Sequence, residues 1–144
     1  MRNFLPARRI TPDERSLIPG AIWQLLLARL QVSFTPSRVW MNRIHRRSVR
    51  AVVAEEIFSC RDFCRTLAGV INGLSRRTPW RSTCLVKALA AHRMLARRGI
   101  KSTVHLGVKK SDSKGLEAHA WLSVDGSVII GGENMNEYSE VTSI

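Results

Sequence analysis

One stretch of the sequence decides the fold, TCLVKALAAHRMLARRG at residues 83–99. Its leucines and alanines recur at the spacing of one helix face, so the stretch is predicted to be a helix with a core-facing side. Ser82 or Thr83 supplies the N-cap, and Gly99 is the glycine that commonly ends a helix. We therefore expect the rest of the chain to be organised around this helix.

Cys84 lies in the first turn of this predicted helix. Backbone N–H groups and the positive end of the helix dipole favour a thiolate there. Cysteine is by default among the most buried residue types, so its position alone does not make it reactive. As a nucleophile, Cys84 would use its own backbone N–H and one further group of the loop 80–83 to bind an oxyanion.

Chain length and composition predict one soluble domain. The 144 residues suffice for one sizeable core and are too few for two full domains. No secretory signal is recognised before residue 20, because charged residues interrupt the apolar positions. The longest apolar stretch, residues 21–34, contains Gln24 and Arg29 and is expected to fall short of a membrane span. Three cysteines without a secretory signal argue for a reducing cytoplasm.

The net charge of +12 is unevenly distributed. Residues 1–100 hold 19 Lys and Arg against 5 Asp and Glu, whereas residues 101–144 hold 4 against 6. A basic surface of this kind suits nucleic acid, an acidic protein partner or an acidic peptide substrate. No helix-turn-helix spacing is evident in the sequence, so nucleic acid is the less favoured partner.

The N-terminal half has helical patterns. Residues 1–10 have no clear pattern and are expected to form a flexible arm. Thr11-Pro12-Asp13-Glu14 is a helix start with a cap and a proline in the first turn. Pro19-Gly20 is expected to interrupt or kink this helix. The helical segments that follow are expected at residues 21–34, 36–47 and 48–74.

After residue 99 the apolar period changes from that of a helix to that of a strand. Asp125-Gly126 is a favoured two-residue hairpin turn. Strands are expected at residues 103–108, 118–124 and 127–130, with a short edge strand at 138–144. The predicted fold is α+β, with a helical region at 11–78 and a core at 79–144 that combines the cysteine helix with a small antiparallel sheet.

His119 is the candidate base for Cys84. It lies on a predicted strand 35 residues after the cysteine, and a strand packed on the cysteine helix can bring its imidazole within reach. His92 lies on another face of the cysteine helix itself and cannot reach Cys84. His105, on the neighbouring strand, stays an alternative.

A third residue is needed to orient the base. Continuous hairpin pairing places Gly132 opposite His119, with Asn134 on the same face as the histidine. Glu133 is the nearest carboxylate, and a bulge at Gly131-Gly132 would turn it to that face. Glu133 is our preferred third residue and Asn134 the alternative.

Cys60 and Cys64 are four residues apart on one helix face, as in some metal sites. The sequence has no second ligand pair at zinc-like spacing. Core packing is therefore expected for both cysteines, and neither a metal nor a cofactor is predicted.

Several segments together resemble one family. They are Cys-Leu-x-Lys-Ala-Leu-Ala, Arg-Arg-Gly-Ile, His-Leu-Gly-Val and Ala-His-Ala-Trp-Leu-x-Val-Asp-Gly. Over about residues 80–132 the chain resembles the leader peptidases of lasso-peptide biosynthesis, within the transglutaminase-like superfamily. The resemblance implies a transglutaminase- and papain-like core with a Cys-His-Asp triad.

The resemblance also implies an activity and partners. A cysteine protease of this kind removes the leader from a ribosomally synthesised precursor peptide in the cytoplasm. Cys84 matches the nucleophile and His119 the base, whereas Gly131-Gly132-Glu133-Asn134 stands where an acidic residue is expected. A separate leader-recognition protein and an ATP-dependent macrolactam synthetase are the implied partners.

Two other functions stay open at this point. A basic, non-catalytic module would bind nucleic acid or an acidic partner without using Cys84. An acyltransferase would use the same Cys84 and His119 pair but pass the acyl group to an amine. The identity of the reaction products separates transfer from hydrolysis.

Overall fold

The computed structural model describes residues 12–34, 57–111 and 115–143, and the structural statements below refer to these residues. The predicted arm at 1–10, the predicted helix at 36–47 and the first part of the predicted helix at 48–74 lie outside them.

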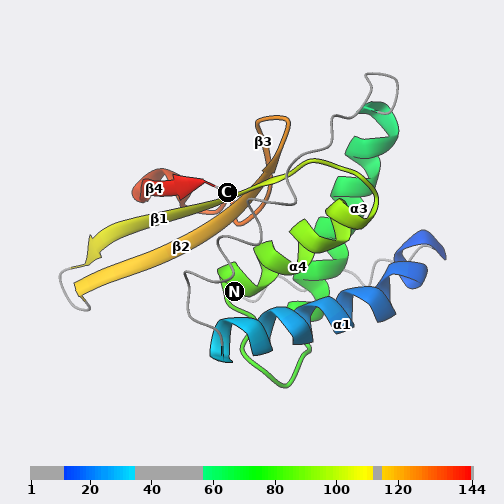
Figure 1. Ribbon diagram of the computed structural model, residues 1–144, viewed down its shortest axis with the longest axis horizontal. Coiled ribbons are helices and arrows are strands. Elements are labelled where there is room, and N and C mark those ends of the chain that lie inside the picture. The colour runs from blue at the N-terminus through cyan, green and yellow to red at the C-terminus, as the bar shows by residue number, and fades with distance from the viewer. Residues whose placement is uncertain (1–11, 35–56, 112–114, 144) are drawn as a thin grey trace, which may run out of the picture.

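The described residues form a layer of helices against one face of an antiparallel sheet (Figure 1). The helices are α1 (Pro12–Phe34), α3 (Ile57–Ser75) and α4 (Cys84–Arg97). The strands are β1 (Thr103–Ser111), β2 (Gly115–Val124), β3 (Ser127–Ile130) and β4 (Ser139–Ser143), in the sheet order β3-β2-β1-β4. This arrangement confirms the predicted α+β fold class.

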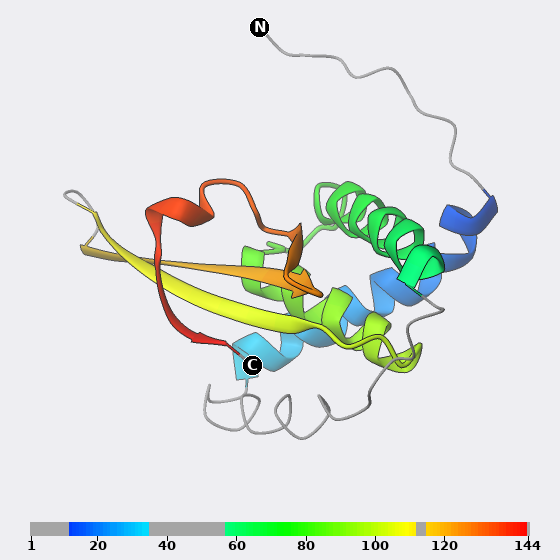
Figure 2. The same cartoon turned by 90° about the horizontal axis from the view of Figure 1, so that it is seen from above.

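The connection from β3 to β4 passes over the sheet on the side away from the helices (Figure 2). It contains a short 3-10 helix, η2 (Met135–Glu137). The sheet is therefore covered on both sides, by the helices on one and by this connection, residues 131–138, on the other.

Helix α1 is continuous through Pro19, so the interruption that was one of the two predicted outcomes is absent there. Pro19 is exposed, so the proline ring and the hydrogen bond that it cannot donate lie on the water side of the helix. On the opposite side Leu17, Ala21 and Leu25 are buried. We attribute the continuity to this packing, which supports the helix on both sides of the proline.

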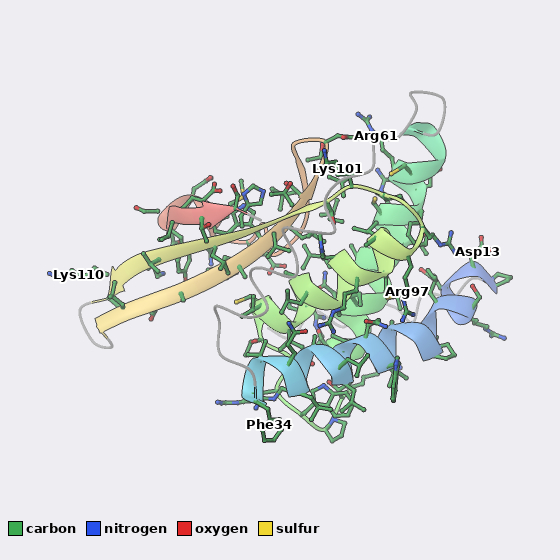
Figure 3. The ribbon with its side chains drawn as sticks, in the orientation of Figure 1. Asp13, Phe34, Arg61, Arg97, Lys101 and Lys110 are labelled. Carbon is green, nitrogen blue, oxygen red and sulfur yellow. The ribbon has the colours of Figure 1, made fainter. Side chains whose placement is uncertain are left out.

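By length and apolar composition alone, α1 meets the requirement for a membrane-spanning helix, contrary to the expectation from its sequence. One side of α1 packs against α4 and α3, as in the core helix of a soluble domain. The other side leaves Ile22, Leu30 and Phe34 exposed, with Phe34 at the helix end (Figure 3). Packing therefore accounts for only one side of its apolar surface.

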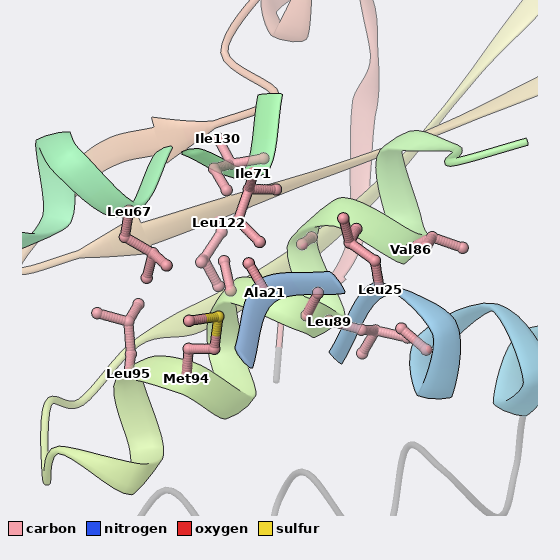
Figure 4. Packing of buried hydrophobic residues seen from close by; sticks show 14 of the residues in the cluster. Ala21, Leu25, Leu67, Ile71, Val86, Leu89, Met94, Leu95, Leu122 and Ile130 are labelled. Atoms are coloured by element: carbon pink, nitrogen blue, oxygen red, sulfur yellow. The ribbon is translucent and has the colours of Figure 1, made fainter. Parts of the chain in front are cut away.

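Helix α4 is the centre of the core. It packs against both other helices and against β1 and β2. Figure 4 shows side chains from several elements that meet on it. The fully buried members of the cluster include Leu25 of α1, Ile71 of α3, Leu89 and Leu95 of α4, Leu122 of β2 and Ile130 of β3.

The hairpin between β2 and β3 has the predicted turn, because Asp125 and Gly126 both have positive φ, 48° and 75°. Its pairing is not continuous, however. Ser123 pairs with Val128 and Leu122 with Ile130, so one strand carries an extra residue at position 129. The bulge thus lies before the glycines, whereas either continuous pairing or a bulge at Gly131-Gly132 was predicted.

We expect Leu122→Ala to lower the free energy of unfolding by about 2–5 kcal/mol, because it opens a cavity in the layer between β2 and α4. The measurement is urea denaturation. Leu116→Ala, on the same strand but 75% exposed, is the matched control and should cost little. Equal losses in the two variants would contradict this account of the core.

Candidate active site

The start of α4 has the cap that the sequence predicted. Thr83 has an extended backbone, and its side chain accepts a hydrogen bond from the N–H of Val86 at 3.5 Å. Ser82 bonds instead with the hydroxyl of Thr78 at 3.1 Å, so Thr83 is the cap. Cys84 is the first residue of the helix and is half-buried, where N–H groups of the first turn point out of the helix.

The N-terminal end of α4 lies beside the middle of β2 in both orientations (Figures 1 and 2). β2 is also the strand that α4 contacts most extensively. The structure therefore brings together the two elements that carry Cys84 and His119. Within the described residues, no hydrogen bond joins the two side chains.

His119 lies on the sheet face turned away from the core. Its neighbours Ala120 and Leu122 are buried in the helix-facing cluster, and side chains alternate along a strand. The imidazole is half-buried, with its centroid 6.1 Å from that of Trp121 and 5.0 Å from that of Tyr138. The ring thus contacts one aromatic residue of its own strand and one of the β3–β4 connection.

The backbone of Gly131 holds one nitrogen of this ring. Nε2 of His119 lies 2.7 Å from the carbonyl oxygen of Gly131. A carbonyl oxygen only accepts, so Nε2 carries the proton and donates it. In the neutral ring Nδ1 then keeps its lone pair, and no described group bonds to it. The ring is therefore in the tautomer of a base that accepts a proton at Nδ1.

The two predicted third residues do not reach the ring. Glu133 is exposed and makes no hydrogen bond or ion pair with any described residue. Asn134 is exposed and has a left-handed backbone, φ 60°, at the start of η2, where its carbonyl accepts from the N–H of Glu137. The predicted role of Glu133, to orient His119, stays a prediction.

His105 is committed to other contacts. Its Nδ1 lies 2.8 Å from a carboxylate oxygen of Glu140, and its Nε2 lies 2.7 Å from the hydroxyl of Ser123. With both nitrogens engaged, His105 is not available to Cys84. The order Ser–His–Glu matches a serine-hydrolase relay, but Ser123 is only 8% exposed. We interpret this series of hydrogen bonds, which no sequence pattern predicted, as a link between β2, β1 and β4.

The other described histidine, His92, is buried on α4 and bonds through Nδ1 to the hydroxyl of Ser102 at 2.9 Å. It therefore belongs to the core. Its place on another face of the helix from Cys84 is the reason why the sequence excludes it as the base.

Cys60 and Cys64 lie on α3 with their sulfur atoms 3.9 Å apart. Cys64 is buried in the core cluster, and this burial raises the pKa of its thiol to about 12, with Cys60 adding to the effect. A thiol held in this way is a poor nucleophile near neutral pH.

Trp80 supplies a donor close in sequence to Cys84. Its indole N–H is buried and has no acceptor among the described residues. A buried donor without a partner costs free energy and calls for an explanation. A second oxyanion donor was predicted in the loop 80–83, and the indole N–H of Trp80 is a donor of that loop that is buried without a partner among the described residues.

Comparison with known families decides the wider assignment. A family described as the transglutaminase-like superfamily matches residues 25–143. The chain belongs to the transglutaminase-like superfamily. Members of this superfamily are usually cysteine peptidases or acyltransferases. Comparisons with curated proteins and with solved structures gave no match.

As a transglutaminase-like protein, the chain should have one cysteine that is alkylated much faster than the core thiol. We expect iodoacetamide to modify Cys84 rapidly at pH 7–9, as mapped by peptide mass spectrometry. With a pKa of about 12, Cys64 keeps only roughly one thiol in a thousand as thiolate at pH 9. Cys64 is thus an internal control, and equal rates at the two positions would contradict the assignment of Cys84.

Proposed function

We propose that the protein is a cytoplasmic cysteine peptidase that removes the leader from a ribosomally synthesised lasso-peptide precursor. One observation carries the proposal. His119 lies on the strand beside the cysteine helix, and its Nε2 donates to Gly131 while its Nδ1 is left without a described partner. Superfamily membership supports cysteine chemistry in general. The finer specificity rests on the resemblance of residues 80–132 to the leader peptidases.

In this mechanism, Nδ1 of His119 accepts the proton of the Cys84 thiol, and the sulfur attacks the carbonyl carbon at the leader–core junction. The proposed oxyanion site combines the N–H of Cys84 with the indole N–H of Trp80, which is buried in the free protein and which the bound substrate would have to uncover. His119 then gives its proton to the departing amine, which becomes the N-terminus of the core peptide. Water, deprotonated by the same imidazole, hydrolyses the leader thioester and restores the thiol.

The proposed partners follow from the surface and the resemblance. A separate leader-recognition protein would present the precursor, and an ATP-dependent macrolactam synthetase would take the released core peptide. Exposed apolar residues often mark protein contacts, and the outer side of α1 carries Ile22, Leu30 and Phe34. The net charge of +12 suits an acidic peptide or partner.

The second candidate function is acyl transfer, which the superfamily also supports. It shares every step up to the thioester, and an amine then replaces water. Product masses distinguish the two, because hydrolysis leaves a free leader carboxylate and transfer leaves an amide.

We expect Cys84→Ala and His119→Ala each to abolish cleavage of the precursor, because one removes the nucleophile and the other its base. Mass spectrometry of the products is the measurement, with circular dichroism to verify the fold. Cys60→Ala is the control and should cleave normally. Retained cleavage in either site variant would overturn the proposal and favour a basic binding module.

We expect Trp80→Phe to lower kcat by about 100- to 1,000-fold with little change in KM, as for the loss of one oxyanion donor. The phenyl ring keeps most of the packing and removes only the N–H. Single-turnover cleavage measures the effect. An unchanged kcat would show that the indole N–H has no part in the reaction.

A further inference from the structure

The ring of His119 is held at Nε2, so the reaction proposed above would use Nδ1. In a cysteine-histidine site an acidic or amide side chain normally takes this orienting part. Here the atom 2.7 Å from Nε2 is a backbone oxygen, that of Gly131.

We propose that the carbonyl of Gly131 is the positioning group for His119, in place of an acidic side chain. The proposal rests on the proposed function, since it assumes that His119 acts as the base. It makes Gly131 a residue that acts through the histidine without touching substrate.

Only glycine fits at this position. The φ angle of Gly131 is +75°, a region that residues with a side chain rarely adopt. A Cβ atom there would also lie 2.5 Å from the backbone oxygen of Ala120 and 3.1 Å from Cα of Trp121. Any side chain would therefore push the carbonyl away from the ring.

The hairpin delivers this carbonyl to its place. The turn at Asp125-Gly126 returns the chain alongside β2, and Ile130, only 1% exposed, anchors the end of β3 in the core. Gly131 follows directly and lies against the backbone of Ala120 and Trp121. The carbonyl is thus fixed by a buried residue on one side and by a close backbone contact on the other.

The aromatic neighbours limit the rotation of the ring. The imidazole contacts the rings of both Tyr138 and Trp121. Tyr138 is in turn held by Lys109, whose ammonium lies 4.8 Å from the phenol ring and 2.7 Å from a carboxylate oxygen of Glu137. These contacts tie the β3–β4 connection, which carries Tyr138, to β1.

A carbonyl differs from a carboxylate in a measurable way. It fixes the Nε2–H tautomer as a carboxylate does, but it has no charge that titrates. The orienting part of the site should therefore be insensitive to replacement of nearby carboxylates, Glu133 included.

The test is heteronuclear NMR on protein with isotope-labelled histidine, combined with cleavage kinetics. Wild-type protein should show a hydrogen-bonded Nε2–H proton for His119, assigned by its loss in His119→Gln. Gly131→Ala should lose this signal and lower kcat by about 100-fold with little change in KM, because the base is no longer aligned.

Two variants serve as controls. Gly132→Ala brings a Cβ to 3.2 Å from a methyl of the half-buried Val128, a tight contact with a side chain and not with the backbone, and Gly132 lacks the positive φ of Gly131, so this variant should keep both signal and kcat. Glu133→Gln should also keep both. If Gly131→Ala does not fold, the wild-type signal and Glu133→Gln still decide the question.

A proton on Nδ1 in the wild type would overturn the proposal. Loss of the Nε2–H signal and of kcat in Glu133→Gln would also overturn it. The Glu133 carboxylate would then be the group that orients His119. A protected Nε2–H signal in a protein that leaves the precursor uncut would be a different result: the hydrogen bond would stand, and the peptidase function would fall.

Discussion

The burial of α4 between α1 and the sheet is the constraint on which the other features depend. Because its side chains fill the layer from Val86 to Leu95, the helix has only one orientation on β2. That orientation places its capped N-terminus, and with it Cys84, beside the middle of the strand. The burial of apolar side chains along α4, remote from Cys84, thus determines where the thiol lies.

The second layer of control is on the outer face of the sheet. Gly107 has no side chain, and a Cβ there would lie 2.8 Å from the ring of Trp121 and 3.0 Å from Cβ of Tyr138. The missing side chain leaves room for both aromatic residues, and the ring of His119 contacts both. Glycine therefore acts twice in this site, once to make room for the aromatic rings and once, at Gly131, to bring a carbonyl to the imidazole.

Much of the fold was predictable from local patterns. The cysteine helix has both a cap and a terminal glycine, and the hairpin has a turn of the favoured type, so their boundaries followed from short-range chemistry. The interruption expected at Pro19 is absent because tertiary packing, which keeps α1 continuous, is not a local property. The bulge at position 129 was missed for the same reason: it depends on how Ile130 fits the core.

The sequence could indicate the members of the site that act through their side chains, but not a member that acts through its backbone. Cys84 and His119 have side chains that point to catalysis, and pattern reasoning finds them as candidates. A backbone carbonyl is present at every residue, so no sequence pattern distinguishes that of Gly131 until the chain is folded. The two adjoining glycines were a signal, because they permit a close backbone approach. We read them as the place of a bulge that serves Glu133, whereas the structure brings the backbone itself to the ring.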